Sequence, residues 1–290
     1  MLALSDLEQI YASHCRHGEE RLYLLADHAG LPELSHKLRA NGVSWTNLLG
    51  DDKRPALTAA SPLLFEVSFS NGRLVKRQLM QRLHDIGQHS FSLLMIATPL
   101  EPQVLAKSLA KRMDGILSEG EEIVLRFFDT RVLPQLLEVM NEHEQRIWLS
   151  VATGWWYSNR DGTTAHISSE FQPQDAHLAP QLISDEQLSY LLEASEIDQI
   201  AYLLESNLLE QFHRMCPIER YRLLQSKITA ARALRLANLG DLALFCGLAF
   251  LHGAQFDTQA PWCDILARVR DGELTLDQAV ELVDQREELH

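Results

Sequence analysis

The chain has little cysteine and no close cysteine pair. Its four cysteines lie at least 17 positions apart, and no Cys-x-x-Cys element occurs. Disulfide-stabilised domains and structural zinc modules depend on regularly and closely spaced cysteines. We therefore expect neither a disulfide framework nor a metal site.

Long hydrophobic runs and an export signal are also missing. The longest apolar run, Leu242 to Leu251, has ten residues, about half of the ~20 that a helix needs to cross a bilayer. The first nine residues lack a basic segment followed by an apolar core. We expect a cytoplasmic protein with no membrane partner.

Positive charge is scarce. The chain has 26 Lys and Arg against 40 Asp and Glu, which gives a net charge of -14. Proteins that bind nucleic acid neutralise phosphate groups with a surplus of basic side chains. Nucleic acid is therefore not an expected partner.

The common catalytic motifs are absent. There is no Gly-x-Ser-x-Gly, no Walker loop, no Gly-x-Gly-x-x-Gly and no His-Glu-x-x-His. These patterns hold a nucleophile, a phosphate group or a pair of zinc ligands in place. We expect a protein that is not an enzyme and needs no cofactor. The alternative is a hydrolase-like enzyme whose site lies at strand ends near Asp27 and Asp129.

Hydrophobic periodicity predicts an α/β domain over residues 1–170, a linker over 171–183 and an all-α domain over 184–290. The first domain alternates strand-like and helix-like segments, so we expect a mixed sheet flanked by helices. The predicted strands are 22–26, 63–67, 91–97, 123–128, 153–158 and 163–168, and the predicted helices are 31–41, 72–87 and 101–113.

The carboxyl-terminal part differs in character. Residues 169–183 contain Pro173 and Pro180 and no sustained period, which is typical of a linker. Capping-box spacing occurs at residues 184–187 and 275–278. The pattern predicts four to six helices from residue 184 to residue 288.

Asp129 and Arg131 lie between a predicted strand and a predicted helix. Corners of this kind in α/β sheets lie at the carboxyl ends of strands, where polar side chains can meet a ligand or a partner. The alternative is that Asp129 caps the helix and pairs locally with Arg131.

Three adjacent aromatic residues, Trp155, Trp156 and Tyr157, occupy one predicted strand. Successive side chains of a strand point to opposite faces, so at least one large ring must point away from the main core. That ring is either covered by the linker or the helical half, or it is an anchor for a partner protein. The outer strand of this hairpin could also accept an added strand from a partner.

A basic element stands out in the acidic carboxyl-terminal half. Its positively charged candidates for partner binding are Arg220, Lys227, Arg232 and Arg235. They form either a solvated face with acidic partners inside the domain or a docking surface for an acidic segment of another protein.

Four segments occur in an order that resembles the bacterial type VI secretion adaptor family, the effector chaperones often encoded beside a VgrG spike protein and its toxin. They are Leu22–Asp27, Ser61–Val67, Leu125–Leu133 and the Trp-rich hairpin. The resemblance covers roughly residues 20 to 165, and the helical remainder is similar to a carboxyl-terminal extension found in that family.

The resemblance implies a non-catalytic chaperone or adaptor. Its partners would be one secreted effector, which it binds in the cytosol, and the VgrG spike, onto which it helps to load that effector. Matching positions of the family pattern are Asp27, Phe127, Asp129 and Arg131, with Thr130 where proline is commoner.

Overall fold

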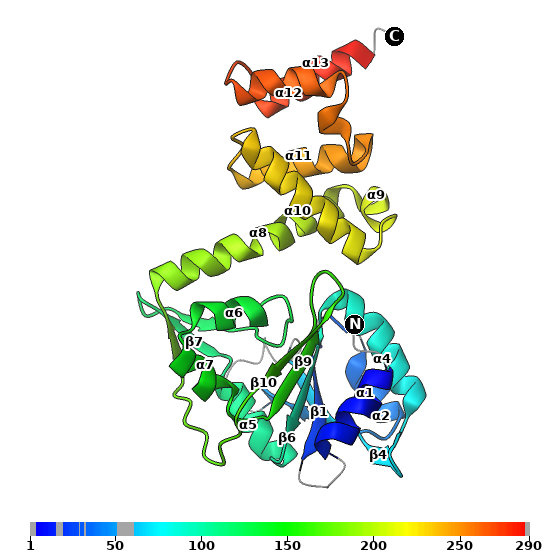
Figure 1. Ribbon diagram of the computed structural model, residues 1–290, viewed down its shortest axis with the longest axis vertical. Helices are drawn as coiled ribbons and strands as arrows, with labels where there is room; N and C mark the ends of the chain where they lie inside the picture. Colours follow the sequence, from blue (N-terminus) through cyan, green and yellow to red (C-terminus); the bar gives the residue numbers. More distant parts are fainter. Residues whose placement is uncertain (1–3, 16–19, 29, 32, 51–60, 288–290) are drawn as a thin grey trace. The chain divides into compact units, whose positions relative to one another are not determined.

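The computed structural model describes residues 4–15, 20–28, 30–31, 33–50 and 61–287 (Figure 1). The chain divides into two compact units, Met1–Leu191 and Leu192–His290. The first contains sheets flanked by helices and the second is helical. The predicted fold class is confirmed.

A six-stranded sheet forms the centre of the first unit (Figure 1). Its order is β10-β9-β6-β1-β3-β2, and every neighbouring pair is antiparallel. The strands are β1 (Arg21–Ala26), β2 (Thr46–Asn47), β3 (Leu63–Glu66), β6 (Leu93–Thr98), β9 (Gly154–Ser158) and β10 (Thr164–Ser168).

Alternate residues of β1 belong to two hydrophobic cores, because the sheet has helices on both faces. Tyr23 and Leu25 face the first core, which contains residues of α5 (Pro102–Lys111), α6 (Leu133–Val139) and α7 (Glu142–Leu149). Leu22 and Leu24 face the second core, which lies on the other face of the sheet and also belongs to the first unit. Its helices are α1 (Leu4–Ile10), the π-helix η1 (Tyr11–Cys15), α2 (Leu34–Ala40) and α4 (Arg77–Ser90). The run from Leu22 to Ala26 is therefore buried throughout.

Two smaller sheets complete the first unit. One has the order β11-β7-β8, from β7 (Asp114–Leu117), β8 (Glu122–Val124) and β11 (Gln181–Ile183), with β11 parallel and β8 antiparallel to β7. The other is the hairpin of β4 (Phe69–Ser70) and β5 (Arg73–Leu74).

The strand predicted over residues 123–128 needs correction. The strand ends at Val124 and belongs to the small sheet rather than to the central one. Leu125, Phe127 and Phe128 are buried all the same. Irregular backbone brings these side chains into the core, so an apolar run here does not signal a strand.

The segment predicted as a linker, residues 171–183, is folded into the first unit. Asp175 forms a salt bridge of 2.9 Å with Arg112, and β11 extends the small sheet. The two compact units separate between Leu191 and Leu192, within α8 (Asp185–Asn207). A buried ion pair and a three-residue strand leave no periodic signal, which is why the sequence suggested a linker.

The second unit packs its helices around a core that includes Leu204, Leu224, Phe245 and Trp262. Six α-helices occur between residues 185 and 287, as predicted. They are α8, α9 (Leu209–His213), α10 (Pro217–Ala233), α11 (Leu239–His252), α12 (Trp262–Arg270) and α13 (Leu276–Glu287), with a 3₁₀ turn η2 (Phe256–Thr258).

Both predicted capping boxes are present. The amide of Gln187 donates to the Ser184 hydroxyl and the Ser184 amide donates to the Gln187 side chain, and Thr275 and Gln278 repeat the arrangement. Across the part of the chain that the structure describes, no helix combines the length and the apolar character needed to cross a membrane.

Candidate functional site

Asp129 and Arg131 form a salt bridge with each other. The Asp129 carboxylate accepts from the Arg131 amide at 3.0 Å, from its Nε at 3.0 Å and from its Nη2 at 2.7 Å. The guanidinium also lies over the ring of Phe91, 5.6 Å from the centroid. Local pairing is thus confirmed, but capping is not, because the residue before α6 is Val132 and no side chain caps that helix.

Asp27 is also bound by an arginine. Arg126 Nη2 donates to Asp27 Oδ2 at 2.8 Å, and its guanidinium lies 5.5 Å from the centroid of Phe128. The Asp27 amide donates to Ser92 O, while Thr130 donates to Phe91 O. The neighbourhoods of Asp27 and Asp129 therefore meet at residues 91–92. Each carboxylate accepts hydrogen bonds from a guanidinium, an arrangement suited to holding loops together.

The two tryptophans point to opposite faces of the sheet, as predicted, and both are buried. Trp155 lies in the first core with no exposed area, and its Nε1 donates to Leu149 O at 3.3 Å. Trp156 lies in the second core, stacked on His166 at 4.5 Å and met edge-on by His14 at 5.1 Å. His14 and His166 cover the second ring.

The burial of both rings does not favour their predicted role as exposed partner anchors. Gly154 shows how closely Trp156 is packed. A Cβ at that position would lie 2.2 Å from the indole Cη2, so only glycine fits without moving the ring. We interpret both tryptophans as core residues, and their contact with a partner stays a prediction.

The basic helix is α10, and its lysine is buried in the second unit. Lys227 Nζ lies 2.6 Å from Asp257 Oδ1, with side chains that are 8% and 11% exposed. Such a pair holds η2 against α10, since Asp257 belongs to η2. Lys227 is therefore poorly placed to meet an acidic partner segment.

The arginines of this element also have partners in the second unit. The Arg220 guanidinium stacks on the Phe212 ring, 4.2 Å from its centroid, and burial lowers its pKa. Arg232 Nη2 lies 2.8 Å from Glu196. Arg235 follows the helix end with a positive φ of 65° and is exposed. Intramolecular pairing thus accounts for Arg220, Lys227 and Arg232, and only Arg235 keeps the character of a surface cation.

Sequence reasoning missed a buried arginine. Arg112 has no exposed side-chain area, and its Nη1 and Nη2 each donate to Asp175 at 2.9 Å. Its Nε donates to Trp148 O and its Nη1 to Ser108 O, both at 2.7 Å. Burial opposes ionisation of Asp175, but the hydrogen bonds and charge of Arg112 outweigh it and lower the pKa of Asp175 to about 2. The partners are 63 positions apart, so no local pattern reveals the pair.

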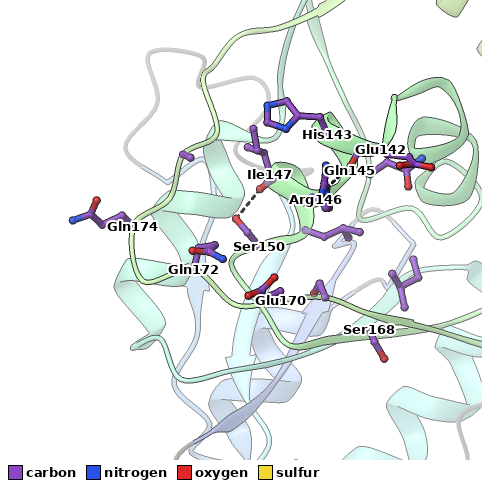
Figure 2. Close-up of a pocket in the computed structure, with 14 residues that line it drawn as sticks. Glu142, His143, Gln145, Arg146, Ile147, Ser150, Ser168, Glu170, Gln172 and Gln174 are labelled. Atoms are coloured by element: carbon purple, nitrogen blue, oxygen red, sulfur yellow. Dashed lines mark hydrogen bonds between the residues drawn. The ribbon is translucent and has the colours of Figure 1, made fainter.

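A pocket with a volume of about 830 Å³ lies between α7 and the chain that follows β10 (Figure 2). One wall contains Glu142, His143 and Arg146 of α7, and the other contains Ser168, Glu170, Gln172 and Gln174. The Ser150 hydroxyl donates to Ile147 O at its base. Ten of its 14 lining residues are polar, and they include both charges. It includes none of the site residues predicted from the sequence.

The described residues offer no metal-binding group, since no three His, Cys, Asp or Glu side chains converge among them. The four cysteines are free thiols. Burial raises the pKa of Cys15 and of Cys246 to about 12, with smaller effects from neighbouring charges. Neither thiol forms a thiolate at neutral pH.

Residues 22–146 match the family described as Domain of unknown function (DUF4123). That range runs from β1 into α7 and contains Asp27, Asp129 and Arg131. No curated protein and no solved structure matches the chain.

Proposed function

We propose that the protein is a non-catalytic adaptor of type VI secretion, which binds one effector in the cytoplasm and helps to load it onto the VgrG spike. The observation that carries this proposal is the match over residues 22–146, because that family is associated with type VI secretion effector adaptors. The matched range includes three of the four segments on which the sequence resemblance depends.

The burial of Asp27 and Asp129, and their pairing with arginines, support the adaptor over the hydrolase-like alternative. A catalytic carboxylate must reach its substrate in a suitable protonation state. Asp27 and Asp129 are instead almost buried, with side chains 6% and 8% exposed, and each is bound to an arginine. In the proposed adaptor, both carboxylates therefore hold neighbouring loops in place.

Exposed apolar side chains offer contact area for a protein partner. Leu178 and Leu182 of the first unit are 85% and 59% exposed, and both follow in the chain the Asp175 that is bonded to Arg112. Apolar groups held on a fixed backbone bind at a low entropic cost, which suits an interface. The proposed adaptor thus has exposed apolar surface for a partner outside the matched range.

Co-expression with the toxin encoded beside its gene tests the proposal. We expect the tagged chain and the toxin to elute together in gel filtration, and the complex to bind the neighbouring VgrG protein. A secreted toxin from an unrelated locus serves as the control and should elute separately. A chain that always elutes without the neighbouring toxin contradicts the proposal.

A separate assay addresses the absence of catalysis. The purified chain should turn over no ester or phosphoester substrate above the rate of a blank. Sustained turnover that disappears in Asp27→Asn or Asp129→Asn, with the fold intact by circular dichroism, would establish the enzyme instead.

A further inference from the structure

Within the described part of the chain, the backbone groups on the outer edge of β10 have no hydrogen-bond partner. Among the described strands, β10 pairs only with β9. Asn159 N donates to Thr163 O at one end of the pair and Ser169 N donates to Thr153 O at the other. Because bonded residues alternate in an antiparallel pair, the odd-numbered residues face β9. Thr164, His166 and Ser168 then point their N–H and C=O groups outward.

This edge lacks the protective features that usually prevent strand addition. Natural edge strands carry proline, lysine or a bulge, or are very short. β10 has the sequence Thr-Ala-His-Ile-Ser and pairs in continuous register over all five residues. The opposite edge strand, β2, has two residues. Of the two edge strands that the structure describes in the central sheet, β10 is therefore the longer one, and its outer side pairs with no described strand.

The pocket beside α7 continues from this edge. Ile167, Ser168 and Ser169 belong to its lining, so the carboxyl end of β10 forms part of the pocket wall (Figure 2). A strand added to β10 would pass from the edge directly into the pocket. In antiparallel pairing, the amino-terminal end of the added strand meets Ser168.

We propose that β10 binds an extended segment of the effector as an additional antiparallel strand, with the amino-terminal end of that segment in the pocket. The main chain of the segment would bond to Thr164, His166 and Ser168, and its first side chains would fill the space against α7. Strand addition of this kind gains affinity from the backbone and specificity from pockets. The inference rests on the proposed function for the identity of the partner.

Charge favours a basic segment of another protein over a second copy of this chain. Two carboxylates, Glu142 and Glu170, line the pocket against one guanidinium, that of Arg146, whose Nε donates to the backbone O of Glu142 at 3.3 Å. A second copy would bring a further net charge of -14 and be repelled. A segment with Lys or Arg near its amino-terminal end fits these carboxylates.

Peptide display on the purified full-length chain tests the inference without knowledge of the effector. We expect enriched peptides to alternate β-favouring residues and to carry Lys or Arg near the amino-terminal end. Ser168→Pro should weaken their binding roughly tenfold or more, since it removes an outward N–H and adds bulk at the edge. Ser168→Ala keeps the N–H and should bind as the wild type does.

Ser168→Pro should leave the sheet intact, because the lost N–H does not face β9 and Ile167 before it is extended. Equal melting temperatures of the two variants would verify this. Hydrogen exchange on the unaltered chain gives an independent measurement. Adding an enriched peptide should slow exchange at Thr164, His166 and Ser168, while Ala165 and Ile167 are already slow.

Three results would overturn the inference: no enriched peptide, equal binding to both Ser168 variants, or protection that leaves the β10 edge unchanged. Dimerisation through β10 in place of peptide binding would also overturn it. The neighbouring toxin separates the two proposals. In one outcome, the toxin elutes with the chain and binds Ser168→Pro as tightly as it binds Ser168→Ala. That result would support the adaptor function and contradict strand addition at β10.

Discussion

Replacing Asp175 by asparagine is expected to destabilise the first unit by about 3 kcal/mol. Arg112 would keep its bonds to Trp148 O and Ser108 O but lose the charge that balances it in a site with no exposure. Removing one member of a buried ion pair costs about 3–5 kcal/mol. The lower end applies because the Asp175 side chain is 14% exposed and water reaches it.

Hydrogen exchange read by mass spectrometry is the suitable assay, since a chain of two units need not unfold in a single step. Peptides from β1 and β6 report on the first unit, and peptides from α11 report on the second. About 3 kcal/mol corresponds to a roughly hundredfold faster exchange in the first unit. Exchange in the second unit should stay unchanged.

The pH dependence gives a second check. The pKa of Asp175 is lowered from 3.8 to about 2 in the folded chain, so the unfolded state binds its proton first as the pH falls. The stabilisation is therefore complete above about pH 4 and is lost as the pH falls towards about 2. The difference between wild type and Asp175→Asn should shrink over that interval.

Glu170→Gln is the matched control, since it neutralises an exposed carboxylate in the same segment. It should change stability by less than about 0.5 kcal/mol. An equally small effect of Asp175→Asn at pH 7, or a difference that persists unchanged at pH 2, would refute the argument from the buried pair.

Three further changes test other parts of the structure. Burial and the nearby Arg112 charge lower the pKa of His177, so its contribution to stability is lost as the pH falls below about 6.5; His177→Gln should flatten that part of the profile in thermal melts between pH 7.5 and 5.5. Trp155→Ala should lower the free energy of unfolding by about 3–5 kcal/mol in urea, and a fully stable variant that only fails to bind the effector would restore the anchor role. Lys227→Met should destabilise the second unit by about 3 kcal/mol by isolating the Asp257 carboxylate, and adding Asp257→Leu should recover most of the loss, as measured by hydrogen exchange in peptides from α11; no recovery would argue against the pair.

Much of the first unit follows from local patterns. The predicted strands over residues 22–26, 63–67 and 91–97 correspond to β1, β3 and β6, and the hairpin strands correspond to β9 and β10. These segments are apolar enough, or alternate regularly enough, for the period of a strand to show. The capping boxes were equally readable, because side chain and backbone partners lie three positions apart.

The candidate site was less predictable, because its contacts join distant parts of the chain. The sequence indicated the Asp129–Arg131 pair, whose members are two positions apart. It did not indicate that His14 covers Trp156 or that Arg112 meets Asp175. It predicted strand-end chemistry for a sheet whose neighbouring strands are all antiparallel. Amino and carboxyl ends of neighbouring strands therefore alternate at each end of the strands, and the carboxyl ends do not gather on one side of the sheet.

The salt bridge between Arg112 and Asp175 sets a practical limit on how the gene can be divided for expression. A fragment that stops at residue 170 discards the only carboxylate bonded to that guanidinium among the described residues and strips β7 of its parallel neighbour. Such a fragment would expose interior surface and tend to precipitate. A fragment that runs through Leu191 retains both, even though the extra stretch looks dispensable by composition.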